Sequence, residues 1–202
     1  MGAMNQPAVA SAVDHDDVVE VLSTAFEQDP VFAALMPDAG SRPTRLRRFF
    51  AVGAGPWALD QGFSWILRDG VKPLGAAVVL ASARRHDPAE NHPTTIARYL
   101  RAFGRHTLKA RSFLEVMEGT HPVEEHLYLP FIGAAQPGRG VGSHLLSAMG
   151  RAADDAGLPL YLEASTETSA HLYRRHGFAD TGTIVAPDMP PLYAMWREPS
   201  TS

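Results

Sequence analysis

The spacing of apolar residues predicts helices in the first part of the chain. Apolar side chains recur every three or four residues after Asp14 and Asp16, either of which could cap a helix. The recurring positions are Val18, Val19, Leu22 and Phe26. The same spacing predicts two further helical segments, a brief one over Val31–Met36 and a longer one over Thr44–Leu59.

The middle of the chain has shorter apolar runs, which are typical of strands. The turn-forming pairs Gln61-Gly62 and Asp69-Gly70 bracket Phe63–Leu67, and a second run follows over Leu74–Ala81. We expect these two runs to form an antiparallel hairpin. A polar loop then leads to Thr94–Glu118, whose pattern predicts one long helix or two consecutive helices.

A strand, a glycine turn and a helix follow one another in the second half. The apolar run Leu127–Ala134 predicts a strand, and periodic apolar residues after the turn predict a helix through Ala156. Gly157 ends this helix. A buried strand over Leu160–Ala164 and a short helix over Thr168–Arg175 are expected to follow.

Length and composition limit the class of protein. With 202 residues, of which 45% are hydrophobic, the chain is long enough for one domain with a sizeable core, expected over 8–199. Residues 1–7 are expected to be disordered or left over from cloning. Because the chain has no cysteine, a disulfide framework, a thiolate zinc site and a cysteine nucleophile are excluded.

Charge and hydropathy favour a cytoplasmic protein, expected to be a monomer or a homodimer. The formal net charge of -4 argues against a surface that binds nucleic acid or anionic membranes. No apolar run approaches the roughly 18 residues of a membrane span, and the N-terminus lacks the pattern of a signal peptide. The basic residues of 94–118 have few aromatic residues among them, so a solvated helix surface is their simplest explanation.

The turn before the second-half helix favours an anion. Gly138, Gly140 and Gly142 permit positive φ angles and let a ligand approach the main chain without meeting a Cβ atom. Unpaired N–H groups of the first helical turn point outward there, and the helix dipole adds partial positive charge. A phosphate group fits such a nest, and Arg139 could reach the same anion.

This turn and a second motif downstream resemble the acetyl-CoA signature of the GNAT N-acetyltransferase superfamily. The first motif is Gly138-Arg139-Gly140-Val141-Gly142-Ser143, and the second is Leu172-Tyr173-Arg174-Arg175-His176-Gly177-Phe178. The strand end Leu162–Ser165 and the segment Pro190–Arg197 look most similar to those of puromycin N-acetyltransferase-like small-molecule acetyltransferases. One departure from the motif is Pro137, which has no N–H to donate to a pyrophosphate.

The resemblance implies an α/β (α+β) fold with a mixed, mostly antiparallel sheet of six to seven strands. It also implies helices on both faces and a V-shaped splay between the central strands. The co-substrate would be acetyl-CoA and the acceptor a primary amine of a small molecule, with direct transfer through a tetrahedral intermediate. The residues expected to contact the cofactor are Ile132, Gly133, Ala134, Gly138, Arg139, Gly140, Val141, Gly142, Ser143 and Ser169.

Acetyl transfer to an amine requires an oxyanion site and an acid for the departing thiolate. The resemblance implies an oxyanion site at a bulge in Leu127–Ala134, where N–H groups around Ile132 and Gly133 would be free. Gly133 fits a bulge or the close approach of a ligand, and Pro130 interrupts regular pairing just before it. The resemblance also makes Tyr173 the acid.

The amine must also lose a proton to a base. Glu163 is the candidate because it lies near the end of its strand, where a partly buried carboxylate would have a raised pKa. Four other residues remain possible, namely Glu118, Glu124, Glu125 and His126. By resemblance, the acceptor contacts are expected from Phe26, Asp29 and Phe32.

Other interpretations of the sequence remain open. Pro137 and Ser169 favour a non-catalytic CoA-binding module with a regulatory or partner-binding role. A dinucleotide-binding protein fits less well, because that fingerprint belongs after the first strand of a βαβ series. Histidines in the 83–93 loop and in His121–His126 suggest a metal site, but the loop is polar, and Pro122 prevents a regular helix in the second segment. We expect no metal.

Overall fold

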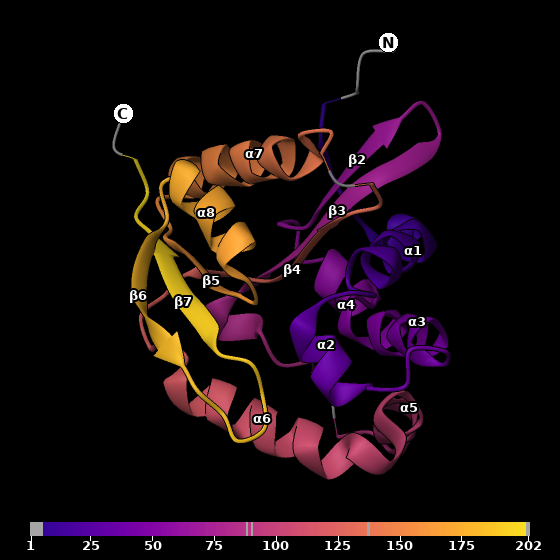
Figure 1. The fold of residues 1–202 in the computed structure, drawn as a ribbon. Helices are drawn as coiled ribbons and strands as arrows, with labels where there is room; N and C mark the ends of the chain where they lie inside the picture. Colours follow the sequence, from indigo (N-terminus) through magenta and orange to yellow (C-terminus); the bar gives the residue numbers. More distant parts are fainter. Residues whose placement is uncertain (1–5, 88, 90, 137, 201–202) are drawn as a thin grey trace.

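The computed structural model describes residues 6–87, 89, 91–136 and 138–200. In this part of the chain, seven strands form one sheet in the order β1-β2-β3-β4-β5-β7-β6 (Figure 1). Their bounds are β1 Ala8–Val9, β2 Trp65–Asp69, β3 Lys72–Ala81, β4 Leu127–Ala134, β5 Leu160–Ala164, β6 Ala179–Ile184 and β7 Leu192–Arg197. Only the β4–β5 pair is parallel among the paired strands described. The mixed, mostly antiparallel sheet is confirmed.

Helices cover both faces of this sheet (Figure 1). The α-helices are α1 His15–Ala25, α2 Pro30–Leu35, α3 Arg42–Gly53, α4 Pro56–Leu59, α5 Pro93–Phe103, α6 Thr107–Thr120, α7 Val141–Ala156 and α8 Glu167–Arg175. Strand β3 shows why both faces are needed. Its side chains alternate, so that Ala76, Val78 and Leu80 pack in the core with α1 and α3, whereas Ala77 and Val79 pack in the core with α7 and α8.

The two central strands diverge. Strands β4 and β5 pair only at Leu127 with Leu160 and at Tyr128 with Tyr161, although both strands continue beyond these positions. The expected V-shaped splay is therefore confirmed. It opens toward the glycine turn, because β4 leads into that turn and then into α7.

The irregularity in β4 lies earlier than expected. Val78 of β3 pairs with Phe131 and Leu80 pairs with Tyr128, so β4 has one extra residue at Leu129-Pro130. Ile132 and Gly133 pair regularly with β3. The bulge expected in Leu127–Ala134 is therefore present, but it lies at Leu129-Pro130 and not at Gly133, because Pro130 cannot donate a ladder hydrogen bond.

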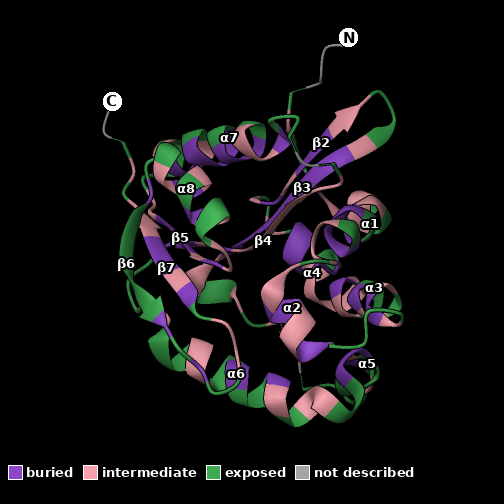
Figure 2. Ribbon diagram, viewed as in Figure 1, coloured by how far each residue is buried: buried purple, intermediate pink, exposed green. Residues whose placement is uncertain are grey.

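Two other features differ from the sequence prediction. The helix expected over Thr44–Leu59 is interrupted, because Gly55-Pro56 ends α3 and starts α4. Strand β6 was not expected at all; five of its six residues are exposed, as Figure 2 shows, so it carries little apolar signal. Thr94–Glu118 forms two helices, as one of the two alternatives predicted.

Within the described ranges, none of the helices is both long and apolar enough to cross a membrane.

Candidate active site

The glycine turn has the backbone geometry of an anion nest. Gly138 and Gly140 have φ angles of 84° and 73°, which only glycine adopts readily. The first helical bond of α7 runs from the His144 N–H to the Gly140 carbonyl at 3.1 Å. The N–H groups of Val141, Gly142 and Ser143 come before this bond. They therefore have no partner within the helix and can bind a ligand.

Close packing holds this turn against the rest of the fold. A Cβ atom on Gly75 of β3 would lie 2.2 Å from Val141 Cγ1, so glycine is required there for α7 to approach the sheet. A Cβ atom on Gly142 would lie 3.2 Å from Leu172 of α8. This contact joins the two sequence motifs physically.

The side chain of Arg139 lies at the surface of the turn. Its guanidinium is 3.8 Å from Asp69, and both side chains are 42% exposed. A pair this exposed is weak, so Arg139 is available to an incoming anion. Pro137, the departure from the motif, lies outside the described residues.

Main-chain N–H groups also face the gap between β4 and β5. The Ala135 N–H donates to the Leu74 carbonyl at 2.9 Å, and alternation along β4 then directs the N–H of Gly133 toward β3 as well. The N–H groups of Ile132 and Ala134 alternate with these and point into the gap. The N–H group that faces the gap next to that of Ile132 is therefore that of Ala134, because the N–H of Gly133 points toward β3.

Gly133 has a different structural role. A Cβ atom there would lie 2.5 Å from Ala25 Cβ and 3.3 Å from Leu22 Cδ2. Glycine therefore allows α1 to pack directly on β4 at the edge of the gap. The close approach at Gly133 is thus made by a helix and not by a ligand, as the sequence had led us to expect.

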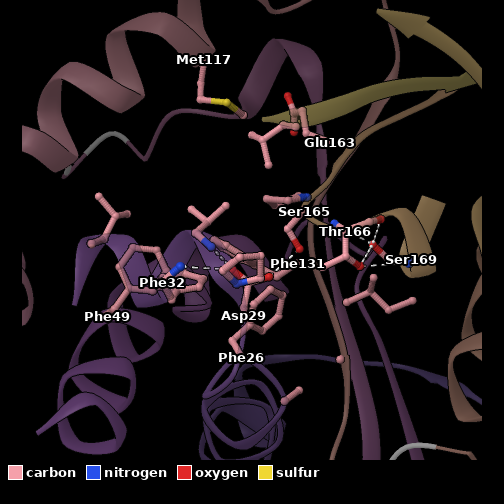
Figure 3. A pocket seen from close by; sticks show the side chains of 18 of the residues that line it. Phe26, Asp29, Phe32, Phe49, Met117, Phe131, Glu163, Ser165, Thr166 and Ser169 are labelled. Carbon is pink, nitrogen blue, oxygen red and sulfur yellow. Dashed lines mark hydrogen bonds between the residues drawn. The ribbon is translucent and has the colours of Figure 1, made fainter. Parts of the chain in front are cut away.

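A cavity of about 520 Å³ lies beside the gap (Figure 3). It is lined by parts of α1, α2, α3, α5, α6, β4, β5, α8 and β7. The predicted site residues that line it are Phe26, Asp29, Phe32, Ile132, Gly133, Ala134, Glu163, Ser169 and Tyr173. The residues predicted to contact the acceptor, to contact the cofactor and to catalyse the reaction thus line one cavity. The most distant of them in the sequence, Phe26 and Tyr173, are 147 positions apart.

Asp29 joins two sides of this cavity. Its carboxylate caps α2 by accepting from the N–H groups of Val31 and Phe32, at 2.9 and 3.1 Å, and it also accepts a hydrogen bond from the Ser165 hydroxyl (Figure 3). Burial raises the pKa of Asp29, and these hydrogen bonds partly oppose the rise. Ionisation of this carboxyl group on the cavity wall therefore costs free energy.

Glu163 lies at the end of β5, on the wall opposite the phenylalanines (Figure 3). Burial raises its pKa from 4.5 to about 7, and the nearby hydroxyls of Tyr128 and Tyr161 only partly oppose this. Its Oε1 atom and the Tyr161 hydroxyl are both buried without a hydrogen-bond partner. A carboxylate with this pKa can accept a proton near neutral pH.

Tyr173 reaches the cavity from α8. It is 8% exposed and packs against Phe178 with ring centroids 5.9 Å apart. Burial, and then the negative charge of Asp29, raise the pKa of Tyr173 well above its usual 10.0. The phenol is therefore protonated at neutral pH and has a proton to donate.

Ser169 has a local structural partner. Thr166 caps α8, and the Ser169 hydroxyl donates to the Thr166 carbonyl at 2.8 Å, while the Ser169 N–H donates to Thr166 Oγ1 at 3.1 Å. The Ser169 side chain lines the cavity while it stabilises the start of α8.

The other candidate bases lie away from the cavity. His126 is fully buried, and its Nε2 lies 3.1 Å from Nε2 of His121. Burial is the main reason why the pKa of His121 falls to about 4 and that of His126 is also lowered. Glu118 pairs with Arg85, and Glu124 and Glu125 are exposed. None of the Glu and His alternatives to Glu163 lines the cavity among the described residues.

Two aromatic residues of the site were not found from sequence. Tyr128 and Tyr161 flank Glu163, with ring centroids 5.9 Å apart, and they belong to β4 and β5 at the last point where these strands pair. Their adjacency depends on strand register, which no local pattern predicts. The described histidines and acidic residues include no group of three or more that could hold a metal ion.

No protein-family model matches the chain. Comparison with solved structures finds an acetyltransferase from Corynebacterium glutamicum, described as related to histone acetyltransferase HPA2, with a TM-score of 0.69 and 26% identity over 99% of both chains. A polyamine N-acetyltransferase from Drosophila melanogaster has a TM-score of 0.66 and 14% identity over 97% of this chain and 100% of its own. Arylalkylamine N-acetyltransferase 2 from Aedes aegypti has a TM-score of 0.60 and 15% identity over 96% and 99%.

The last two similarities concern the fold, because their identity is low. The first covers nearly the whole chain at higher identity, and it agrees with the glycine turn, the splay and the adjacent cavity. This chain is a member of the GNAT acyltransferase superfamily.

Proposed function

We propose that this protein transfers the acetyl group of acetyl-CoA directly to the primary amine of a small molecule. The observation that carries the proposal is one cavity that combines a gap in the sheet, a buried carboxylate of raised pKa and a buried phenol. Structural neighbours that are named as acetyltransferases of small amines support the reaction class.

The residues around the turn fit the cofactor. The N–H groups of Val141, Gly142 and Ser143 would hold its pyrophosphate, with Arg139 adding a positive charge. When bound, acetyl-CoA supplies the thioester that is the acetyl donor. The Ile132 and Ala134 N–H groups that face the gap would bind the acyl oxygen and stabilise negative charge as it develops.

Glu163 would accept the proton from the amine. A pKa of about 7 leaves a large fraction of the carboxylate ionised at neutral pH and still basic enough to take up a proton. Its unpartnered Oε1 atom is available for this contact. Asp29, on the opposite wall, would attract the substrate as an ammonium ion.

Tyr173 would donate a proton to the departing thiolate. A thiol has an ordinary pKa near 8.5, so transfer from a phenol of raised pKa to free thiolate is uphill. The donation is then concerted with cleavage of the carbon–sulfur bond, when the sulfur is still developing its charge. The chain needs no covalent intermediate, which agrees with its lack of cysteine.

The test is a titration with acetyl-CoA followed by thiol release with a panel of primary amines. Tyr173→Phe should lower kcat by roughly 10²–10⁴-fold, with little effect on acetyl-CoA affinity. Tyr193→Phe is the control, since Tyr193 lies on β7 outside the cavity lining. Absence of acetyl-CoA binding would refute the proposal, and binding without thiol release for any amine would favour a non-catalytic module.

A further inference from the structure

The acceptor side of the cavity is walled by aromatic rings. Six of the nine phenylalanines in the chain line it, and they come from six separate segments: Phe26, Phe32, Phe49, Phe103, Phe113 and Phe131. Several of them contact one another, with Phe32 5.4 Å from Phe26 and 5.1 Å from Phe49, measured between ring centroids. Figure 3 shows four of these rings, those of Phe26, Phe32, Phe49 and Phe131, facing Met117 across the cavity. The wall is a packed surface that suits an apolar ligand.

The cavity is lined by few charged side chains. Its described lining residues include two carboxylates, Asp29 and Glu163, and no lysine, arginine or histidine. One ammonium group therefore finds partners beside the gap in the sheet. A second ammonium farther along the ligand would lose water among phenyl rings, and the cation–π attraction of phenylalanine compensates only part of that cost.

A second cavity, of about 880 Å³, adjoins the first. The two share part of their lining, namely Phe103, Ala110, Leu114, Met117 and Tyr128. Beyond this shared wall the second cavity is lined by apolar residues of α5, which include Ile96 and Leu100. These two side chains are 45% and 48% exposed, so the second cavity leads to an open apolar face.

The charged residues around the second cavity already have partners. Arg85 pairs with Glu118, and the Arg111 guanidinium lies 2.9 Å from Glu115. The acidic residues described here are thus neutralised by their own neighbours. These ion pairs leave no strong site for a second cation of the ligand. The apolar surface between the ion pairs remains available to the ligand.

We propose that the acceptor is a monoamine carried on an elongated apolar body, of the arylalkyl class, and that it occupies both cavities. This inference rests on the proposed function. The amine lies between Asp29 and Glu163, the first part of the body lies against the phenylalanines, and its far end passes Met117 to reach Leu100. Methionine suits this position, because its flexible side chain can move aside for a chain of variable length.

The experiment compares phenethylamine, a phenylalkylamine with a longer chain, spermidine and agmatine as acceptors. Both arylalkylamines should have a higher kcat/KM than the two polycations, and the longer one should have the lowest KM. Leu100→Ser should raise the KM of the longer amine by about five- to tenfold, because an apolar contact is lost, and leave the KM of phenethylamine unchanged. The matched control is Leu108→Ser, since Leu108 is 78% exposed on α6 and lines neither cavity.

The possible results separate this inference from the function on which it rests. Faster turnover of spermidine or agmatine would overturn the inference and leave amine acetylation intact. Equal effects of Leu100→Ser on both arylalkylamines, or no effect on either, would overturn the two-cavity placement. Thiol release with none of the four amines and none of the wider panel would overturn both proposals.

Discussion

Burial of Glu163 should make the protein less stable as the pH rises, and Glu163→Gln should remove this dependence. The native pKa of about 7 exceeds the ordinary value of 4.5, so the folded state binds the proton more tightly than the unfolded state. The contribution of Glu163 to stability is therefore fully present below about pH 4.5 and is lost as the pH rises through 7. At 1.36 kcal/mol per pKa unit, the complete loss is about 3 kcal/mol.

The assay is urea unfolding of the wild type and of Glu163→Gln at pH 5 and at pH 8. Glutamine has nearly the same shape and does not titrate, so its stability relative to the wild type should increase by about 2–3 kcal/mol between these pH values. Glu20→Gln on the exposed side of α1 removes the same charge from a solvated position and should show no such increase. A constant difference between wild type and Glu163→Gln would refute the argument that desolvation dominates at this site.

Three further substitutions test other parts of the site. Gly140→Ala should cost about 1 kcal/mol through its positive φ and also weaken acetyl-CoA binding by titration calorimetry, whereas Gly157→Ala, with φ 66° at the other end of α7, should only destabilise. Gly133→Ala should cost about 1–3 kcal/mol in urea, because its Cβ overlaps α1, whereas Gly182→Ala meets no atom within 4 Å. Asp29→Asn should raise the amine KM several-fold with little change in stability, because asparagine also caps helices.

Each of these predictions has an opposing outcome. Equal acetyl-CoA affinity for the two helix-end variants would show that the turn does not hold the cofactor. A Gly133→Ala protein as stable as the Gly182→Ala protein would show that α1 can move away from β4. An unchanged KM in the Asp29→Asn enzyme, with its unfolding transition preserved, would exclude Asp29 as the ammonium partner.

The sequence predicted the elements that are apolar and bounded by glycine. Leu127–Ala134 and Leu160–Ala164 are strands with the expected bounds, and the helix after the turn ends at Ala156. In each case the local pattern and the tertiary environment agree, because these elements are central and buried. Strand β6 was missed for the opposite reason, since an exposed edge strand carries polar residues that resemble a loop.

The predictable part of the site is likewise its local part. Positive φ at Gly138 and Gly140 follows from a turn that only glycine can form, so the sequence contains the information. The aromatic wall is different. Phe49 and Phe113 lie 64 positions apart, in helices that also bury other apolar residues, and nothing in either helix indicates that these side chains face one cavity. Such sites depend on how helices pack, which sequence periodicity does not specify.

The gap in the sheet brings together groups from its two faces. Tyr173 belongs to the core that packs under α7 and α8, whereas Tyr161 belongs to the core on the opposite face. Glu163 lies two positions after Tyr161 and therefore points to that same opposite face. A continuous sheet would separate Tyr173 from Glu163, the acid and the base that we propose, but β4 and β5 stop pairing at Tyr128 and Tyr161, just before Glu163. The end of pairing thus determines where a proton donor and a proton acceptor can share one cavity, and it also frees the main-chain N–H groups that such chemistry requires.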